Sequence, residues 1–273
     1  MEAVVVNRWT MKRWLICGLG LVASVAMTTS AAVATEGDRP HATVVLVHGA
    51  WADSSSWSAV ARELHGDGYR TAAPDLEMQS VAGDVAALRD TLDAIPGKKI
   101  LVAHSYGGVV ASGASAGRAD VRALVFSAAF LPDEGDSIAS LGVGFQPSGA
   151  FAHLAFTGAP FASPAYIAPD FFRQFFAQDL SPARAAQLNA AQHPLNFPIV
   201  TTPSGPVGWH ELPSWYAVSG ADLMIDPAQE RSMAGRAGAH VVEYPGASHA
   251  GGITRFADRF TSLIERADRA TGG

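Results

Sequence analysis

The sequence is almost devoid of cysteine. The single cysteine, Cys17, lies near the amino terminus, inside an apolar run that is expected to be removed from the mature chain. A mature chain without cysteine forms no disulfide, and it has neither a thiol nucleophile nor a cysteine-ligated metal site. Covalent chemistry by a thiol is thereby excluded.

Basic residues are too few for a nucleic-acid partner. The chain has 19 Lys and Arg against 25 Asp and Glu, a formal net charge of -6, and no block of like charge. This balance provides no basic patch that could attract nucleic acid or acidic lipid. Of the 273 residues, 48% are hydrophobic, which is enough to build one sizeable core. We therefore expect one domain.

The chain lacks an apolar run of transmembrane length. Its longest apolar run, residues 14–27, is shorter than the roughly 20 residues that span a bilayer. Small residues ending at Ala34 follow this run, and three basic residues precede it: Arg8, Lys12 and Arg13. This order predicts a signal peptide over residues 1–34 and a secreted or periplasmic protein with no stable membrane anchor. A membrane anchor is the alternative, and Met11 is an alternative start of translation.

From residue 42 onward, short β-branched runs alternate with segments of helical periodicity. This rhythm predicts a mostly parallel sheet flanked by helices. The expected strands cover residues 43–47, 71–73, 100–103, 121–130, 215–219 and 241–244. The expected helices cover residues 57–64, 81–95, 107–116 and 256–264.

This alternation of strand-like and helix-like segments stops between about residues 131 and 212. Pro, Ala and Phe dominate there, and no strand is clear. An insertion that interrupts a sheet and then returns to it is typical of a cap over a site. We expect an inserted, largely helical cap, with a separate second domain as the alternative.

A candidate nucleophile lies where the strand of residues 100–103 meets the following glycine-rich helix. The local sequence is Ala103-His104-Ser105-Tyr106-Gly107-Gly108. A strand, a serine and a glycine-rich helix start in this order are typical of a nucleophile elbow, and the helix start favours a developing oxyanion. Ala103 replaces the first glycine of the G-x-S-x-G pattern, a change of one methyl group. The alternative is an ordinary serine cap on a buried helix.

A serine needs a base, and the base needs an acid to orient it. His249 follows the strand of residues 241–244, where this architecture places its base. Asp222, on the loop after the preceding strand, is the expected acid. Asp226 precedes a proline and reads instead as a helix cap. Asp133, after the strand of residues 121–130, is the alternative acid.

Two backbone N–H groups are expected to form an oxyanion hole. One follows the nucleophile, at Tyr106, and the other lies on the first strand-to-helix loop, at Ala50. Acyl transfer by this set of residues needs no cofactor and no metal.

The chain resembles the α/β hydrolases related to plant methyl-ester esterases and hydroxynitrile lyases, especially their bacterial members. The motifs that carry the resemblance are Val44-Val45-Leu46-Val47-His48-Gly49-Ala50, Ala103 to Gly108, Val125 to Asp133, Pro213 to Tyr216, Asp222 to Ile225, and Ser248-His249. The resemblance covers essentially residues 42–268 and implies the α/β-hydrolase fold, so we expect an α/β-hydrolase catalytic domain over residues 35–273. It also implies the triad of Ser105, Asp222 and His249, and a pocket lined by Phe and Trp between core and cap.

Two positions bear on the reaction. The lyases that the chain resembles need a Thr after the first-loop His and a Lys after the catalytic His, whereas Gly49 and Ala250 occupy these places here. We therefore predict a serine hydrolase that cleaves a small, apolar carboxylic ester or lactone through an acyl-enzyme. The alternatives are a lyase-like or cofactor-free oxygenase enzyme on the same fold, and a ligand receptor with little turnover.

Overall fold

The structure is a computed structural model, and it describes residues 41–272. The predicted signal peptide of residues 1–34, together with Cys17, lies outside the described residues, so export stays a prediction. Over the described range, none of the helices has the length and apolar character needed to cross a membrane.

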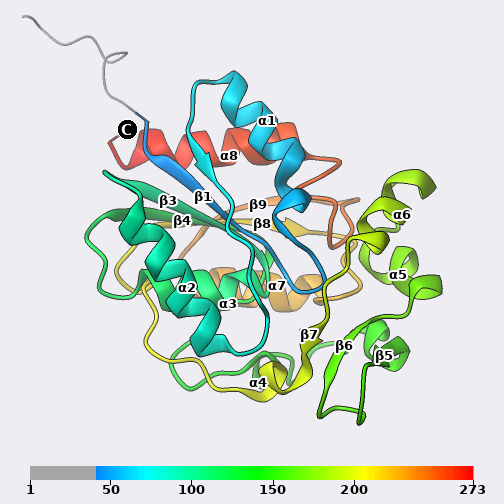
Figure 1. Cartoon of the computed structure of the whole chain (residues 1–273). Helices are drawn as coiled ribbons and strands as arrows, with labels where there is room; N and C mark the ends of the chain where they lie inside the picture. The colour runs from blue at the N-terminus through cyan, green and yellow to red at the C-terminus, as the bar shows by residue number, and fades with distance from the viewer. Residues whose placement is uncertain (1–40, 273) are drawn as a thin grey trace, which may run out of the picture. The chain divides into compact units, whose positions relative to one another are not determined.

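A six-stranded sheet forms the centre of the described part of the chain (Figure 1). Its strand order is β2-β1-β3-β4-β8-β9, and every neighbouring pair is parallel. The strands are β1 (Thr43–Val47), β2 (Thr71–Ala72), β3 (Lys99–Ser105), β4 (Val121–Ala129), β8 (Ser214–Ser219) and β9 (His240–Tyr244). The predicted parallel sheet is confirmed, with strand ends within one or two residues of those expected.

Helices cover both faces of this sheet (Figure 1). One face packs against α1 (Ser58–Gly66) and α8 (Ala257–Ala270), and the other against α2 (Val81–Ala94), α3 (Gly107–Ser115) and α7 (Pro227–Arg236). Successive strand residues point to opposite faces, so a strand covered on both sides is apolar throughout. In β1, Val44 and Leu46 join the cluster under α1 and α8, whereas Val45 and Val47 join the other cluster.

The chain between β4 and β8, residues 130–213, leaves the sheet; we call it the cap segment. Its helices are α4 (Ile138–Leu141), α5 (Pro169–Phe176) and α6 (Pro182–Ala190), with 3-10 turns at Gly149–His153 and Phe197–Thr201. It also contains an antiparallel sheet of β5 (Leu154–Phe156), β6 (Pro164–Ile167) and β7 (Leu195–Asn196). The prediction of a largely helical cap did not include these three strands.

The physical reason for this miss is strand length. The three cap strands have three, four and two residues, too few for an alternating pattern to show. Moreover, β6 begins at Pro164, and a proline in a run argues against a strand unless it lies at an end or an edge.

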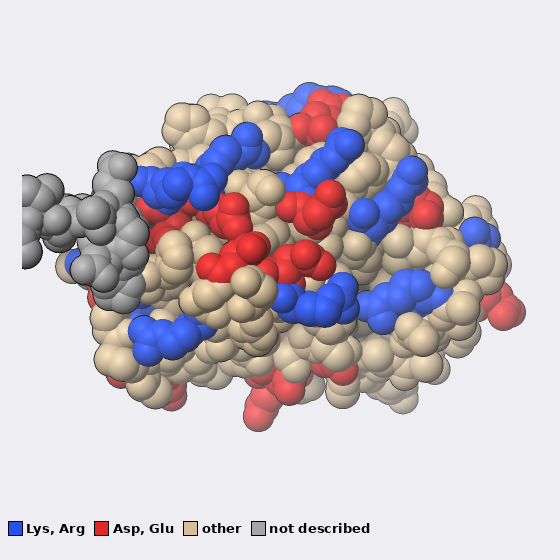
Figure 2. All heavy atoms as spheres, turned by 90° about the horizontal axis from the view of Figure 1, so that it is seen from above, with Lys and Arg blue, Asp and Glu red and all other residues tan. Residues whose placement is uncertain are grey.

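Charge is mixed over the face that α1 and α8 form. Figure 2 shows Lys and Arg side chains interspersed with Asp and Glu across this face. Several of these charges pair with one another, such as Arg269 with Glu265 at 3.6 Å on α8. This face carries no broad patch of one sign.

Candidate active site

Ser105 is the last residue of β3, and its backbone is in an unusual conformation. Its φ angle is +54°, in the left-handed region that residues other than glycine rarely adopt. Such a conformation costs about 1–3 kcal/mol and persists only where the surroundings enforce it. Here β3 continues directly through Ser105 and Tyr106 into α3, and the Phe130 N–H donates to the Ser105 carbonyl at 3.1 Å. Ser105 thus lies on the sharp strand-to-helix turn that the sequence predicts.

The glycines after Ser105 are required by close backbone approach. A Cβ at Gly107 would lie 2.5 Å from the carbonyl oxygen of Val47 and 2.6 Å from that of His48. A Cβ at Gly108 would overlap the carbonyl oxygen of Phe130 and approach the Ala129 Cβ to 3.0 Å. Because backbone cannot move aside as a side chain can, both positions exclude any larger residue.

We expect Gly108→Ala to lower the free energy of unfolding by about 2 kcal/mol, since the added methyl group would overlap the backbone of Phe130 and crowd the Ala129 side chain. The control is Gly235→Ala on α7, where an added Cβ meets nothing within 4 Å. That exposed substitution is expected to stabilise the protein by about 0.5–1 kcal/mol. Denaturant unfolding of both variants measures the difference. Equal stability of the two variants would contradict the packing described here.

Asp222 and His249 form a buried pair. The His249 Nδ1–H donates to Asp222 Oδ2 at 2.7 Å, and both side chains are 1% exposed or less. The other carboxylate oxygen, Oδ1, accepts the N–H groups of Met224 at 2.6 Å and Ile225 at 3.0 Å. Asp222 is therefore held from both sides and fixes the tautomer of His249, because Nδ1 carries the proton.

The remaining nitrogen of His249 is free to act as a base. Its Nε2 is buried and has no hydrogen-bond partner within residues 41–272. With Nδ1 protonated, Nε2 carries the lone pair of a neutral imidazole. Ser105 and His249 line the same cavity, although no hydrogen bond joins them in this structure. Nucleophile–base hydrogen bonds are often long in proteins without substrate.

The two predicted oxyanion donors also line this cavity. Ala50 and Tyr106 border it together with Ser105 and His249. In the part of the chain that the structure describes, neither the Ala50 nor the Tyr106 N–H donates to another group. Unpaired backbone N–H groups beside a candidate nucleophile are the donors that a tetrahedral oxyanion requires.

His48 holds the loop that carries Ala50. Its Nδ1–H donates to the Gly49 carbonyl at 2.9 Å, while its Nε2 accepts the Leu76 N–H at 2.8 Å. Burial lowers the pKa of His48, and the neutral ring has the one donor and one acceptor that these bonds need. The His48 side chain thereby fixes the loop after β1. From the sequence alone, His48 is recognised only as the residue before this loop.

His104 has a role that sequence reasoning missed. Its ring packs against His249, with centroids 4.6 Å apart, and lines a different cavity from the one that Ser105 lines. Its Nε2–H donates to the His249 carbonyl at 2.9 Å. Burial, reinforced by the neighbouring His249, lowers the pKa of His104 well below its usual range, so the ring stays neutral. Nothing in the sequence around His104 indicates that its side chain will pack against His249 and bond to its carbonyl.

The two other acid candidates lie elsewhere in the structure. Asp226 caps α7, accepting the Ala228 N–H at 2.8 Å, with Pro227 in the first turn, so its predicted capping role is confirmed. Asp133 is exposed and pairs with His210 at 2.9 Å. Only Asp222 of the three contacts His249.

The cavity at Ser105 is bounded by core and cap. It encloses about 380 Å³ of empty space, part of it open to solvent. Apart from Ser105, Tyr106 and His249, its lining is apolar: Ala50, Trp51, Phe130, Ile138, Phe151, Leu195, Val200, Met224 and Ile225. Five of these residues, Phe130, Ile138, Phe151, Leu195 and Val200, come from the cap segment. Ligands in such a space are recognised mainly by shape and apolar contact.

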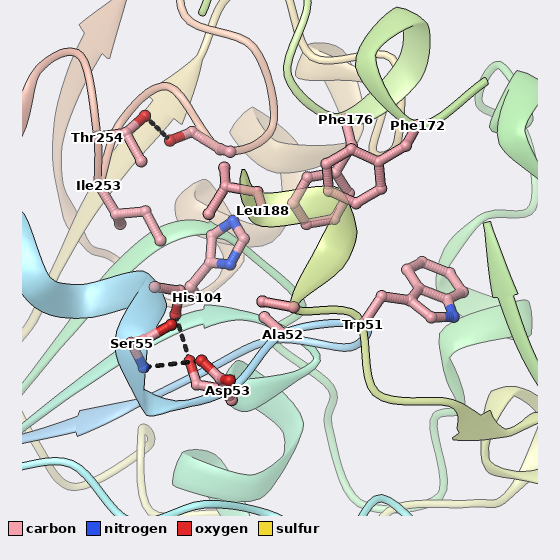
Figure 3. Close-up of a pocket in the computed structure, with 13 residues that line it drawn as sticks. Trp51, Ala52, Asp53, Ser55, His104, Phe172, Phe176, Leu188, Ile253 and Thr254 are labelled. Carbon is pink, nitrogen blue, oxygen red and sulfur yellow. Dashed lines mark hydrogen bonds between the residues drawn. The ribbon is translucent and has the colours of Figure 1, made fainter. Parts of the chain in front are cut away.

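Trp51 separates this cavity from a second one, because it lines both. Its indole Nε1–H donates to the Ala165 carbonyl on cap strand β6 at 2.9 Å. Figure 3 shows the second cavity, with the ring of His104 facing it and Phe172 and Phe176 along its wall. The loop that carries Ala50 is therefore tied to the cap segment.

Comparison with known proteins agrees with this architecture. Among curated proteins, a carbendazim-hydrolysing esterase from a Nocardioides species is 35% identical over 113 residues, which are 37% of this chain and 47% of that protein. The match thus spans about half the length of this relative. Among solved structures, polyneuridine aldehyde esterase superposes with a TM-score of 0.72 at 19% identity, covering 84% of this chain and 100% of that chain. A pyrethroid hydrolase from Sphingobium faniae superposes with a TM-score of 0.71 at 22% identity, covering 84% and 98%.

At these identities the solved structures share the fold with this chain. A sequence model of the alpha/beta hydrolase family matches residues 44–260, a range that begins in β1 and ends in α8. The chain therefore belongs to the alpha/beta hydrolase family.

Proposed function

We propose that the protein is a carboxylic ester hydrolase that uses Ser105 as nucleophile, His249 as base and Asp222 as the acid that orients it. The observation that carries this proposal is the buried Asp222–His249 pair at 2.7 Å: His249 Nε2 has no partner in the described chain, and His249 lines the same cavity as Ser105. A nucleophile, a base and an orienting acid in this relation define the serine hydrolase mechanism.

The proposed reaction proceeds in two steps. Ser105 Oγ forms a bond to the ester carbonyl carbon while His249 Nε2 takes its proton, and the N–H groups of Ala50 and Tyr106 stabilise the oxyanion. The alcohol leaves with the proton from Nε2, and the acyl group stays on Ser105. Water then attacks the acyl-enzyme, giving its proton to His249, and the carboxylic acid leaves as Ser105 recovers its proton.

The apolar lining of the cavity favours a small, apolar ester as the substrate. Side chains from the cap segment, such as Phe151 and Leu195, line this cavity together with Ser105. The names of the relatives support the same class, because the matched proteins include two named as esterases and one as a pyrethroid hydrolase. A lactone of similar size would also fit this description.

The residues at positions 49 and 250 argue against the alternative of a lyase. A Cβ at Gly49 would lie 2.7 Å from the Ser105 Cβ and 3.0 Å from His104 Nδ1, so a threonine does not fit there. Ala250, after the base, is buried, and its N–H donates to the Phe176 carbonyl at 3.0 Å. The alanine at this position carries no ammonium group, which the lyases that the chain resembles need after the catalytic His.

Purified protein is expected to hydrolyse short-chain p-nitrophenyl esters, with kcat/KM at least about tenfold higher for acetate and butyrate than for palmitate, because the cavity is small. Initial rates of nitrophenol release across the acyl series measure this, with matched lactones and amides tested in parallel. Tight binding without turnover would instead indicate a receptor, and selective cleavage of a cyanohydrin would indicate a lyase.

A further inference from the structure

A second carboxyl group lies beside Asp222, and the proposed reaction does not use it. Glu230, on α7, has 0% exposure, the lowest value for any acidic residue in the described chain. Burying an ionised carboxylate without a partner is strongly unfavourable. The group must therefore be neutralised by a cation or by a proton.

The contacts of Glu230 leave it without a cation. Its Oε2 accepts the Ser219 N–H at 3.0 Å, while Oε1 receives no hydrogen from any group in residues 41–272. Arg231, the next residue, points outward and pairs with Glu243 at 2.7 Å. On β8, the Tyr216 hydroxyl is engaged with Ala129, accepting from its N–H at 2.9 Å and donating to its carbonyl at 2.6 Å.

Ser219 brings Glu230 and Asp222 together, because its N–H donates to Glu230 Oε2 at 3.0 Å while its carbonyl accepts the Asp222 N–H at 3.1 Å. The carboxyl group next to Glu230 is that of Asp222. Two carboxylates in contact cannot both be ionised, so one of them holds a proton. Asp222 accepts three hydrogen bonds, from Met224, Ile225 and His249, whereas Glu230 accepts one. Hydrogen bonds to the ionised form favour that form, so the charge belongs on Asp222 and the proton on Glu230. In agreement, burial and the neighbouring Asp222 raise the pKa of Glu230 well above its usual range.

We propose that Glu230 is a positioning residue for the candidate triad: a neutral carboxylic acid whose O–H donates to Asp222 and holds that carboxylate ionised and aligned on His249. This inference rests on the proposed function for its effect on catalysis, but the protonation itself can be tested without any substrate. Charge-assisted hydrogen bonds of this kind are among the strongest in proteins.

Substitution separates this role from simple filling of space. Glu230→Gln keeps a neutral donor of the same shape, and kcat is expected to stay within about threefold of wild type. Glu230→Met keeps the volume but removes the donor, and kcat is expected to fall about 10- to 100-fold with KM little changed, because only the alignment of the base is affected. A merely structural role would make the two variants similar. A loss of activity in Glu230→Gln as large as in Glu230→Met would overturn the proposal.

The pH dependence of stability gives a readout without substrate. The pKa of Glu230 is raised in the folded chain from its ordinary value of 4.5, so above that value the folded state binds one more proton than the unfolded state. Glu230 therefore makes its full contribution to the free energy of unfolding of the wild type below about pH 4.5. This contribution is lost as the pH rises toward the pKa of Glu230 in the folded chain. The Gln side chain has no such proton. The stability of Glu230→Gln relative to wild type is thus expected to grow between about pH 5 and pH 8.

Glu243→Gln is the matched control. Glu243 is partly exposed, and its hydrogen bond with Arg231 lowers its pKa, so its contribution is present above the ordinary pKa and is lost only as the pH falls. The stability difference between this variant and wild type should therefore be constant between about pH 6 and pH 8. A constant difference for Glu230→Gln as well would show that Glu230 is ionised, which would overturn the proposal.

Infrared difference spectra of the full chain locate the proton. Wild type minus Glu230→Gln at neutral pH should show the carbonyl band of a protonated carboxylic acid, and glutamate-specific 13C labelling of wild-type protein should shift that band. A band that shifts with labelled aspartate instead would place the proton on Asp222 and refute the inference. If wild type hydrolyses no ester while the glutamate band is present, the proposed function fails and the protonated Glu230 stands.

Discussion

Replacement of Ser105 by alanine is expected to lower kcat for ester hydrolysis by about four to six orders of magnitude while leaving the fold intact. Only the hydroxyl that is proposed to form the acyl bond is lost, and the backbone hydrogen bond from the Phe130 N–H to the Ser105 carbonyl is kept. The Ala50 and Tyr106 N–H groups and the cavity would remain, so a small residual rate over water is expected. Initial rates on a p-nitrophenyl ester measure the effect, and thermal unfolding tests whether the fold is retained.

Ser112→Ala provides the matched control, because Ser112 is a fully buried serine on α3 whose hydroxyl has no partner in the described chain. This variant should react with a fluorophosphonate probe as wild type does, whereas Ser105→Ala should not react. Activity of Ser105→Ala within tenfold of wild type, or continued labelling, would refute the assignment of the nucleophile.

Replacement of Asp222 by asparagine is expected to lower kcat by about three to four orders of magnitude. The Asn oxygen can still accept the N–H groups of Met224 and Ile225, but its NH2 group would then face His249 Nδ1. The imidazole would have to carry its proton on Nε2, where it cannot act as a base toward Ser105. The imidazolium that forms in the transition state would also lose its counter-charge.

The two other acid candidates serve as controls on the same ester. Asp226→Asn should be nearly silent, since Asn caps a helix as well as Asp and can still accept the Ala228 N–H. Asp133→Asn should also change kcat little, because this side chain is exposed and contacts His210 rather than His249. Collapse of activity in Asp133→Asn with Asp222→Asn still active would show that the acid follows β4 instead of β8.

The parts of this molecule that sequence predicts well are those with a local physical cause. The strand ends follow from β-branched runs, as at Thr43–Val47, because a strand buried on both faces must be apolar throughout. The elbow at Ser105 follows from small residues that must tolerate contact between backbones at Gly107 and Gly108. The pairing of Asp222 with His249 follows from their positions after two neighbouring parallel strands, β8 and β9, whose carboxyl ends meet at one edge.

The parts that sequence does not predict depend on contacts between distant residues. His104 and His249 are 145 positions apart, and nothing local to His104 indicates that its Nε2–H will donate to the His249 carbonyl. Glu230 reads as an ordinary helix residue, because its environment depends on how α7 packs against β8. The short strands of the cap segment form by pairing with one another and have too few residues for a pattern.

The cap segment leaves and re-enters the sheet at two adjacent strands, β4 and β8, which sets the entropy lost in closing this loop. Four residues of each strand pair in register, from Leu124 with Ser214 to Ser127 with Ala217, although the whole cap segment separates them along the chain. The entropy lost in closing a loop grows only with the logarithm of its length, so doubling the insertion costs about 0.6 kcal/mol. A cap of different length or sequence could therefore be exchanged between these two strands with little penalty to the sheet. The positions of Ser105, Asp222 and His249, which the sheet sets, would be inherited unchanged while the shape of the cavity evolved.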